Sequence, residues 1–530
     1  MEKKQAWPRG IKALYYLTAI FIFLIIVCLV LNRVVNRRIS QSLEQVSSGL
    51  NMSYSSISTN VLNSSVTIND LSFSIKGKED SSQQHKFSFG TVTLTGLNFF
   101  KLMSSKKLEI EKMKLENSNL SFDHNLSSQK ISAPAAFTPF NEVAIDEIEL
   151  TDFIGSLHTG KHEDMSLEGG LILKGVQIDD LKKSLDKNNI HLASIKGKVS
   201  SLEYKIPGKY QSVQIKNLEV DSKESTLTID TCRIVPRLDK FEMGRKKGYQ
   251  VDYVEGTSTG IEMEKLDVME LFNKKLIAEK IKIDHNDIYV FRDRRLPLKG
   301  DNKDMPMEDL ESLPMSIRVQ SATVNASNFS YEEFPKKGNE SGILKILRMH
   351  ASIAPLINHP QKGDPPFITL KASGSLMGSG TVTTTMEMPF QKDQDYKVQG
   401  EFKKLDLTKL NASAENLGRI HIESGMLDYL GYQFDMNKEK ATGKIVGEYH
   451  DLVIDKLKDK TSDKKVDKIK SFFLKQVIIP KNKDKSLAES KRTGKVSYNR
   501  DPTRYFSYYM LHSLLTGVKA SFTLGFLLPG

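Results

Sequence analysis

The residues most able to do chemistry gather in one short stretch. Residues 155–162 read GSLHTGKH, one mismatch away from a phosphate-binding P-loop, but His162 stands where the loop needs a Ser or Thr for Mg²⁺. No helical pattern follows, so nucleotide binding is not expected. The side chains here that could hold a metal ion are His158, His162, Glu163 and Asp164. Gly155 and Gly160 favour a flexible loop, so an envelope hydrolase built on this cluster is a remote alternative.

Motifs of other enzyme classes are missing from the sequence. It contains no nucleophile elbow, no HExxH and no CxxC pair, and no spacing singles out two carboxylates. Arg292, Arg294 and Arg295 surround Asp293 at the end of a predicted strand, where a structural ion pair is expected. We therefore predict that the chain is not an enzyme and needs no cofactor and no metal.

A strand pattern organises the rest of the chain. Residues 106–122 read KKLEIEKMKLENSNLSF, and apolar side chains alternate with polar ones in short runs that one extra polar residue separates. A period of two is typical of a strand that buries one face. The apolar positions are Leu108, Ile110, Met113, Leu115, Leu120 and Phe122.

The same pattern returns 168 residues later, at residues 274–290, which read KKLIAEKIKIDHNDIYV. Ile281 and Ile283 now occupy the places of Met113 and Leu115. After each copy come a polar, proline-containing loop and a further strand pattern. In the second copy that strand contains Ile317, Val319 and Val324. This order predicts an internal duplication and an array of strands that bury one another, the alternative being chance similarity between two charged strands.

Composition limits the functional classes. The 530 residues exceed one ordinary core, and 27% charged with 39% hydrophobic residues is usual for folded protein. The net charge is +11, but 76 Lys and Arg are interleaved with 65 Asp and Glu, so no field of one sign builds up. We therefore expect no nucleic-acid partner.

An apolar N-terminal segment predicts a membrane anchor. Residues 13–31 carry no charge and would span roughly 28 Å as a helix, close to the hydrocarbon core of a bilayer. Basic residues on both sides lean slightly towards an N-terminus inside the cell. The predicted layout is a cytoplasmic tail at 1–12, a transmembrane signal anchor at 13–31, a first β-repeat region at 32–291, a loop at 292–313, a second β-repeat region at 314–500, and an apolar or amphipathic segment at 501–530.

The C-terminal stretch, residues 505–528, is the second most apolar part of the chain. His512, Lys519 and two glycines interrupt it. We expect an amphipathic or interfacial helix here. A buried core helix is the second reading and another membrane span the third.

The anchor followed by strands such as VTINDLSFSI, VTLTGLNFFKLM and KKLEIEKMKLENSNLSF resembles the AsmA-like family of bacterial envelope proteins, which includes TamB-type members. The segments GEYHDLVIDKL (447–457) and VSYNRDPTRYFSYYMLHSLLTGVK (496–519) resemble long members of that family from Bacteroidetes-type bacteria. The likeness covers nearly the whole chain, although most of its motifs are degenerate amphipathic repeats.

The resemblance implies an inner-membrane protein whose bulk lies in the periplasm. Its fold would be mainly β, an elongated, curled, groove-like repetitive sheet with a few helices after the transmembrane helix. Its function would be to bind or transfer phospholipid along an apolar groove in support of outer-membrane biogenesis, with membrane lipids and other envelope proteins as partners.

The groove would be lined by apolar side chains of the repeated strands. The candidates are Leu108, Ile110, Met113, Leu115, Ile281, Ile283, Ile317, Val319 and Val324. One face of each strand would shelter acyl chains and the other would carry Lys, Glu and Asp towards water. The alternative is a membrane-anchored scaffold or assembly factor in which the same residues form a closed core.

Overall fold

The computed structural model describes residues 51–60, 64–76, 84–97, 107–123, 142–159, 162–180, 189–458, 466–467 and 492–521. It is mainly β, as the alternation predicted, with few helices. The predicted anchor at 13–31 lies outside the described residues. Within them, no helix is both long and apolar enough to cross a bilayer.

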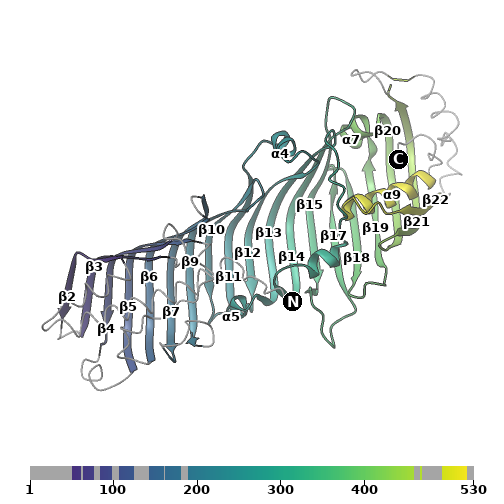
Figure 1. Cartoon of the computed structure of the whole chain (residues 1–530). Coiled ribbons are helices and arrows are strands. Elements are labelled where there is room, and N and C mark those ends of the chain that lie inside the picture. The colour runs from purple at the N-terminus through teal and green to yellow at the C-terminus, as the bar shows by residue number, and fades with distance from the viewer. Residues whose placement is uncertain are drawn as a thin grey trace. The chain divides into compact units, whose positions relative to one another are not determined.

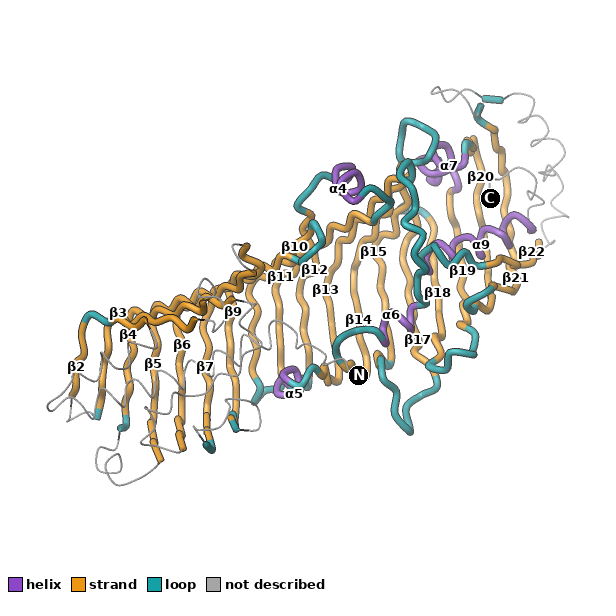
Figure 2. The backbone as a smooth tube through the Cα atoms, in the orientation of Figure 1, coloured by secondary structure: helices purple, strands orange, loops and turns teal. Residues whose placement is uncertain are grey.

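The chain divides into two compact units. The first comprises Met1–Cys232 and Glu264–Lys274, and the second comprises Arg233–Met263 and Lys275–Gly530. Figures 1 and 2 show the strands of both units and the helices that accompany them. Each unit is described by itself below.

The first unit is a sheet of mostly antiparallel strands. Its described elements are β1 (Asn51–Ser53), β2 (Ser56–Asn60), β3 (Ser65–Lys76), β4 (Gln84–Thr95), β5 (Lys107–Asp123), β6 (Glu142–Thr159), β7 (His162–Ile178), β8 (Ile190–His191), β9 (Ser194–Lys205), β10 (Gln211–Asp221) and α5 (Val268–Phe272). β3, β4 and β5 pair antiparallel in sequence order, as do β6, β7, β9 and β10. β5 and β6 are parallel. β11 (Thr226–Pro236) runs across the boundary between the units.

The second unit repeats this scheme. Its described elements are α4 (Lys240–Lys247), β12 (Asp252–Glu264), β13 (Lys275–Asp293), α6 (Pro306–Glu311), β14 (Ser316–Phe334), β15 (Gly342–Ala354), β16 (Leu356–Ile357), β17 (Phe367–Leu376), β18 (Gly380–Pro389), β19 (Tyr396–Asp406), the 3-10 helix η3 (Leu407–Leu410), α7 (Asn411–Gly418), β20 (Ile420–Met436), β21 (Lys440–Lys456), β22 (Arg492–Asn499) and α9 (Phe506–Ser521). β13 and β14 are parallel, and the ladders from β14 to β22 are antiparallel.

The two parallel pairs confirm the internal repeat. β5 aligns Lys107 with Glu142 of β6, and β13 aligns Lys275 with Ser316 of β14. Both ladders skip one residue on each strand soon after the start, at Glu111 in the first copy and at the matching position of the second copy, Glu279. The extra polar residue of the sequence pattern therefore lies at this break in the ladder.

Residues with positive φ angles form a line across the strands of the first unit. Asp70, Asn117, Asp152 and Asn217 all have positive φ, between 50° and 52°. The registers place Asp70 and Asn117 on either side of Gly90 in β4. Asn and Asp tolerate this left-handed conformation better than other side-chain-bearing residues, and such irregularities bend strands. The strands accordingly bend along a common line, and Figure 2 shows them curving near one edge of this unit.

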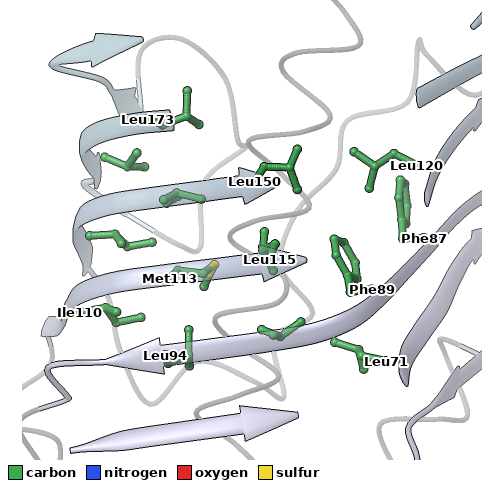
Figure 3. Close-up of a cluster of buried hydrophobic side chains, with 14 of the residues drawn as sticks. Leu71, Phe87, Phe89, Leu94, Ile110, Met113, Leu115, Leu120, Leu150 and Leu173 are labelled. Atoms are coloured by element: carbon green, nitrogen blue, oxygen red, sulfur yellow. The ribbon is translucent and has the colours of Figure 1, made fainter. Parts of the chain in front are cut away.

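Each unit has its own hydrophobic cluster. In the first, alternating residues of β3 to β7 form a core that includes Leu71, Phe87, Met113, Leu115 and Leu150, shown in Figure 3. In the second, the cluster involves β17 to β22, α6 and α9. β13 and β14 contribute no member to this second cluster.

Candidate apolar binding face

The candidates from the first copy are sealed in the core. Leu108, Ile110, Met113 and Leu115 are between 0% and 2% exposed and belong to the cluster of the first unit. Leu115 pairs with Val92 on one side and with Leu150 on the other, both also buried. A ligand could reach these side chains only if this unit opened.

The candidates from the second copy divide into two groups. Ile317 and Val319, near the start of β14, are buried at 8% and 0% exposure. Ile281, Ile283 and Val324 are only half-buried. The parallel register places Ile283 beside Val324, so the half-buried candidates share one face of the sheet.

This half-buried surface continues onto the next strand. Ala322 pairs with Ile281 in β13 and with Ile353 in β15, and Val324 pairs with Ala351. All of these residues are half-buried. We call the set the apolar strip, and its members are Ile281, Ile283, Ala322, Val324, Ala351 and Ile353. Ile353 and Ala351 were not predicted, because register shifts within β15 break the simple alternation.

Helices cover the same face of the sheet further along the second unit. Met305, just before α6, and Met307, within it, lie in the cluster, and the backbone N–H of Met307 donates a hydrogen bond to the Tyr396 hydroxyl at 3.2 Å. α9 packs on β21 and β22 (Figure 1). A Cβ atom added at Gly517 would meet Val496 at 2.8 Å, so α9 approaches the sheet closely. The apolar face is thus covered over β21 and β22 and half-exposed at the strip.

α9 corresponds to the predicted C-terminal helix. Its buried residues are Tyr509, Ser513, Gly517 and Ser521, small or aromatic residues on one side. For this segment the structure therefore favours the second reading, a helix that contributes to the core, over the first, an interfacial helix. Residues 522–528 of the predicted stretch lie outside the described residues.

Charged side chains border the strip at the far end of β13. Arg292 binds Asp252 through two hydrogen bonds of 2.8 and 2.7 Å, and only 9% of its side chain is exposed. Burial opposes the charge of Arg292, but Asp252 outweighs it and the pKa of the guanidinium is raised. Arg294 donates to Glu333 at 3.0 Å, and Tyr331 donates to the same carboxylate at 2.8 Å. We call Arg292, Arg294, Tyr331 and Glu333 the charged rim.

The opposite face of these strand ends carries a separate network. The Tyr289 hydroxyl donates to Glu332 at 2.5 Å, and Lys240 of α4 lies 3.0 Å from the same carboxylate. Burial raises the pKa of Tyr289, with the Glu332 carboxylate adding to the effect. Asp293 binds Arg295 at 2.7 Å, which confirms the ion pair predicted for this segment. This network attaches α4 to β13 and β14 and is structural.

The histidine cluster of the sequence does not converge. His158 and Glu163 face each other across the β6–β7 ladder, but the His158 ring contacts Ser156 at 3.0 Å. Asp164 accepts a hydrogen bond from Thr159 at 2.5 Å. No group of three or more His, Cys, Asp or Glu able to hold a metal occurs in the part of the chain that the structure describes.

Comparison with known proteins adds no family. No protein-family model matches the chain, and no curated protein sequence matches it.

Proposed function

We propose that this chain is a non-enzymatic, membrane-anchored envelope protein that binds phospholipid on the apolar strip of its second unit. The observation that carries the proposal is the half-buried apolar surface across β13, β14 and β15. Strand backbones satisfy each other's hydrogen bonds, so such a face offers only side chains to a ligand. Each methylene that an acyl chain buries there contributes about 0.8 kcal/mol.

The wider setting is also part of the proposal. The resemblance to AsmA-like proteins and the predicted anchor at residues 13–31 favour a bacterial inner-membrane protein with its bulk in the periplasm. There it would carry phospholipid along an elongated, curled apolar groove in support of outer-membrane integrity, together with other envelope proteins. No nucleic acid, cofactor or metal has a part in this function.

A second candidate function is a membrane-anchored scaffold with a closed β core. The sealed cluster of the first unit favours it, because Met113 and Leu115 are 0% exposed. In the first proposal the apolar strip of the second unit binds lipid, and in the second it is part of a closed core. The test therefore changes residues of the strip.

The experiment is lipid extraction and native mass spectrometry of the full chain purified from membranes in detergent. Wild-type protein should retain phospholipid, and Ile283→Asp or Val324→Asp should lose most of it while unfolding at nearly the wild-type temperature. The matched control is Thr323→Asp, because Thr323 directly precedes Val324 in β14 and lies on the other face of that strand. A lipid-free wild-type protein that takes up nothing from vesicles would leave the scaffold as the better proposal.

A further inference from the structure

One side of α9 carries a ladder of cationic and aromatic side chains. Arg504 precedes the helix, and its guanidinium lies 5.0 Å from the centre of the Tyr508 ring. Tyr508 stacks on His512 with ring centres 3.9 Å apart. These residues are spaced by four, so they share a face that differs from the one packed on the sheet through Ser513 and Gly517.

Positive charge collects around His512. Burial lowers the pKa of His512, and the charges of Lys519, Arg294 and Arg504 lower it further, while only Glu333 raises it. His512 thus has cationic neighbours from two segments, the turn after β13 and the α9 segment. Surroundings of this kind attract an anion.

The Arg504 guanidinium retains hydrogen-bonding capacity. Its Nε atom is buried and has no hydrogen-bond partner among the described residues, and its nearest carboxylate oxygen, on Asp501, lies at 3.7 Å. Arg500 likewise has a buried Nε without a partner. A buried N–H that is left unpaired is costly, and an oxygen-rich anion would satisfy it.

The charged rim connects this cluster to the apolar strip. The β13–β14 ladder is interrupted after Ile283, and the β5–β6 ladder is interrupted at the matching place, on either side of which Leu115 and Leu120 are both buried. By the same shift in alternation, Val290 and Arg292 continue the face on which the strip lies. Arg294 follows in the turn after β13 and binds Glu333, the partner of Arg292 in the ladder. Ile288, Val290 and Phe329 are half-buried and fill the interval. From Ile283 to Val290 the strand extends at most about 23 Å, a length that an extended acyl chain can cover. From Ile283 towards the end of β13, the side chains on this face thus change from apolar to cationic.

We propose that Arg294, Arg504, His512 and Lys519 form a binding site for the phosphate group of an anionic lipid headgroup. The inference rests on the proposed function, because the strip would hold the acyl chains of the same molecule. Arg504 would donate through its unpaired Nε, and Arg294 would share its donors between Glu333 and the phosphate. His512 would add one N–H, and Lys519 would add charge.

The test compares ligands that differ only in the headgroup. The full chain in detergent is titrated with phosphatidylglycerol and with diacylglycerol of identical acyl chains, and occupancy is read by native mass spectrometry. We expect wild-type protein to prefer phosphatidylglycerol by about tenfold or more, and Arg504→Gln with His512→Gln to reduce that preference at least fivefold. The control is Lys397→Gln, an exposed lysine of β19, which should leave the preference unchanged.

The outcomes separate the two proposals. Equal binding of both ligands, with Ile283→Asp still abolishing it, would overturn the headgroup site and leave the lipid-binding strip in place. Binding of neither ligand would remove the proposed function and the headgroup site together. A further arm uses calorimetry with inorganic phosphate. Affinity for it equal to that for phosphatidylglycerol would identify a free-phosphate site and overturn the assignment to a lipid.

Discussion

Asp152 in β6 and Ala326 in β14 adopt the same left-handed backbone conformation at matching points of the two parallel pairs. Their φ angles are 50° and 44°, and each stands where the ladder with the preceding repeated strand is interrupted. Asp adopts this conformation with modest strain, whereas for Ala it costs about 1 kcal/mol or more. The duplicated strands therefore keep a bend that the second sequence no longer favours.

Ala326→Gly should accordingly stabilise the second unit. Ala326 is exposed, so the change removes strain without opening a cavity, and we expect a gain of about 0.5–1 kcal/mol. Hydrogen exchange of β14 peptides, analysed by mass spectrometry, measures it. Ala322→Gly is the control, because Ala322 does not have a positive φ and the change should destabilise the same strand. Equal effects of both changes would contradict the strain argument.

The two copies of the repeated strand should respond differently to truncation. Leu115→Ala removes a side chain with 0% exposure from a sealed core, and we expect a loss of about 2–5 kcal/mol in the first unit. Ile283→Ala removes a half-buried side chain from the strip, so the loss in the second unit should be about 1 kcal/mol.

Hydrogen exchange of β5 and β13 peptides reports each unit separately. A loss at Ile283 as large as that at Leu115 would mean that the strip is a closed core in solution. That result would favour the scaffold over the lipid-binding protein.

The contrast between Leu115 and Ile283 shows what the sequence pattern can and cannot predict. Alternation in residues 106–122 predicted which side chains of β5 share a face, and the repeat predicted the second copy at β13. Alternation does not reveal what covers that face, because the covering residues come from distant segments such as α5 in the first unit and α6 and α9 in the second. The sequence therefore grouped sealed Leu115 with half-exposed Ile283.

The ion pairs of residues 292–295 were predicted only in part. The ion pair between Asp293 and Arg295 is local, since the two residues are only two positions apart, and the sequence predicted it. The partners of Arg292 and Arg294 are Asp252 and Glu333, which lie about 40 residues away in the chain. Only the strand register brings them together, and no pattern in residues 292–295 indicates it.

Packing of α9 should depend on two glycines. A Cβ at Gly494 in β22 would clash with the carbonyl oxygen of Gly517, and that atom is backbone and cannot rotate away. We expect Gly494→Ala to displace α9, to expose part of the apolar face and to increase binding of the dye ANS. Protease cleavage within residues 506–521 should quicken at least several-fold.

Gly418→Ala is the matched control for this change. Gly418 ends α7, and a Cβ there would meet nothing within 4 Å. It should leave dye binding and proteolysis unchanged. Normal α9 protection in Gly494→Ala would show that the helix does not rest on β22 in solution.

His85 should make the first unit sensitive to acid. The ring lies between Phe87 and Phe122, and its Nδ1 accepts a hydrogen bond from the backbone N–H of Asp123 at 3.0 Å. Burial lowers the pKa of His85 to about 4, against the opposing charge of Asp123, whereas an unfolded histidine has a pKa of about 6.5. Because the unfolded chain binds the proton more readily, stability falls as pH drops from about 6.5 to about 4. The loss should approach about 3 kcal/mol.

Hydrogen exchange of β4 peptides at pH 7 and at pH 4.5 measures this loss, after correction for the intrinsic exchange rate. His85→Asn keeps an acceptor near Asp123 but cannot titrate in this range, so its β4 protection should change much less between the two pH values. His450 is the contrasting control, since its hydrogen bond to Asp428 raises its pKa and makes acid favour the fold locally. An equal acid response of wild type and His85→Asn would assign the sensitivity to other groups, because burial of one imidazole could then not be its cause.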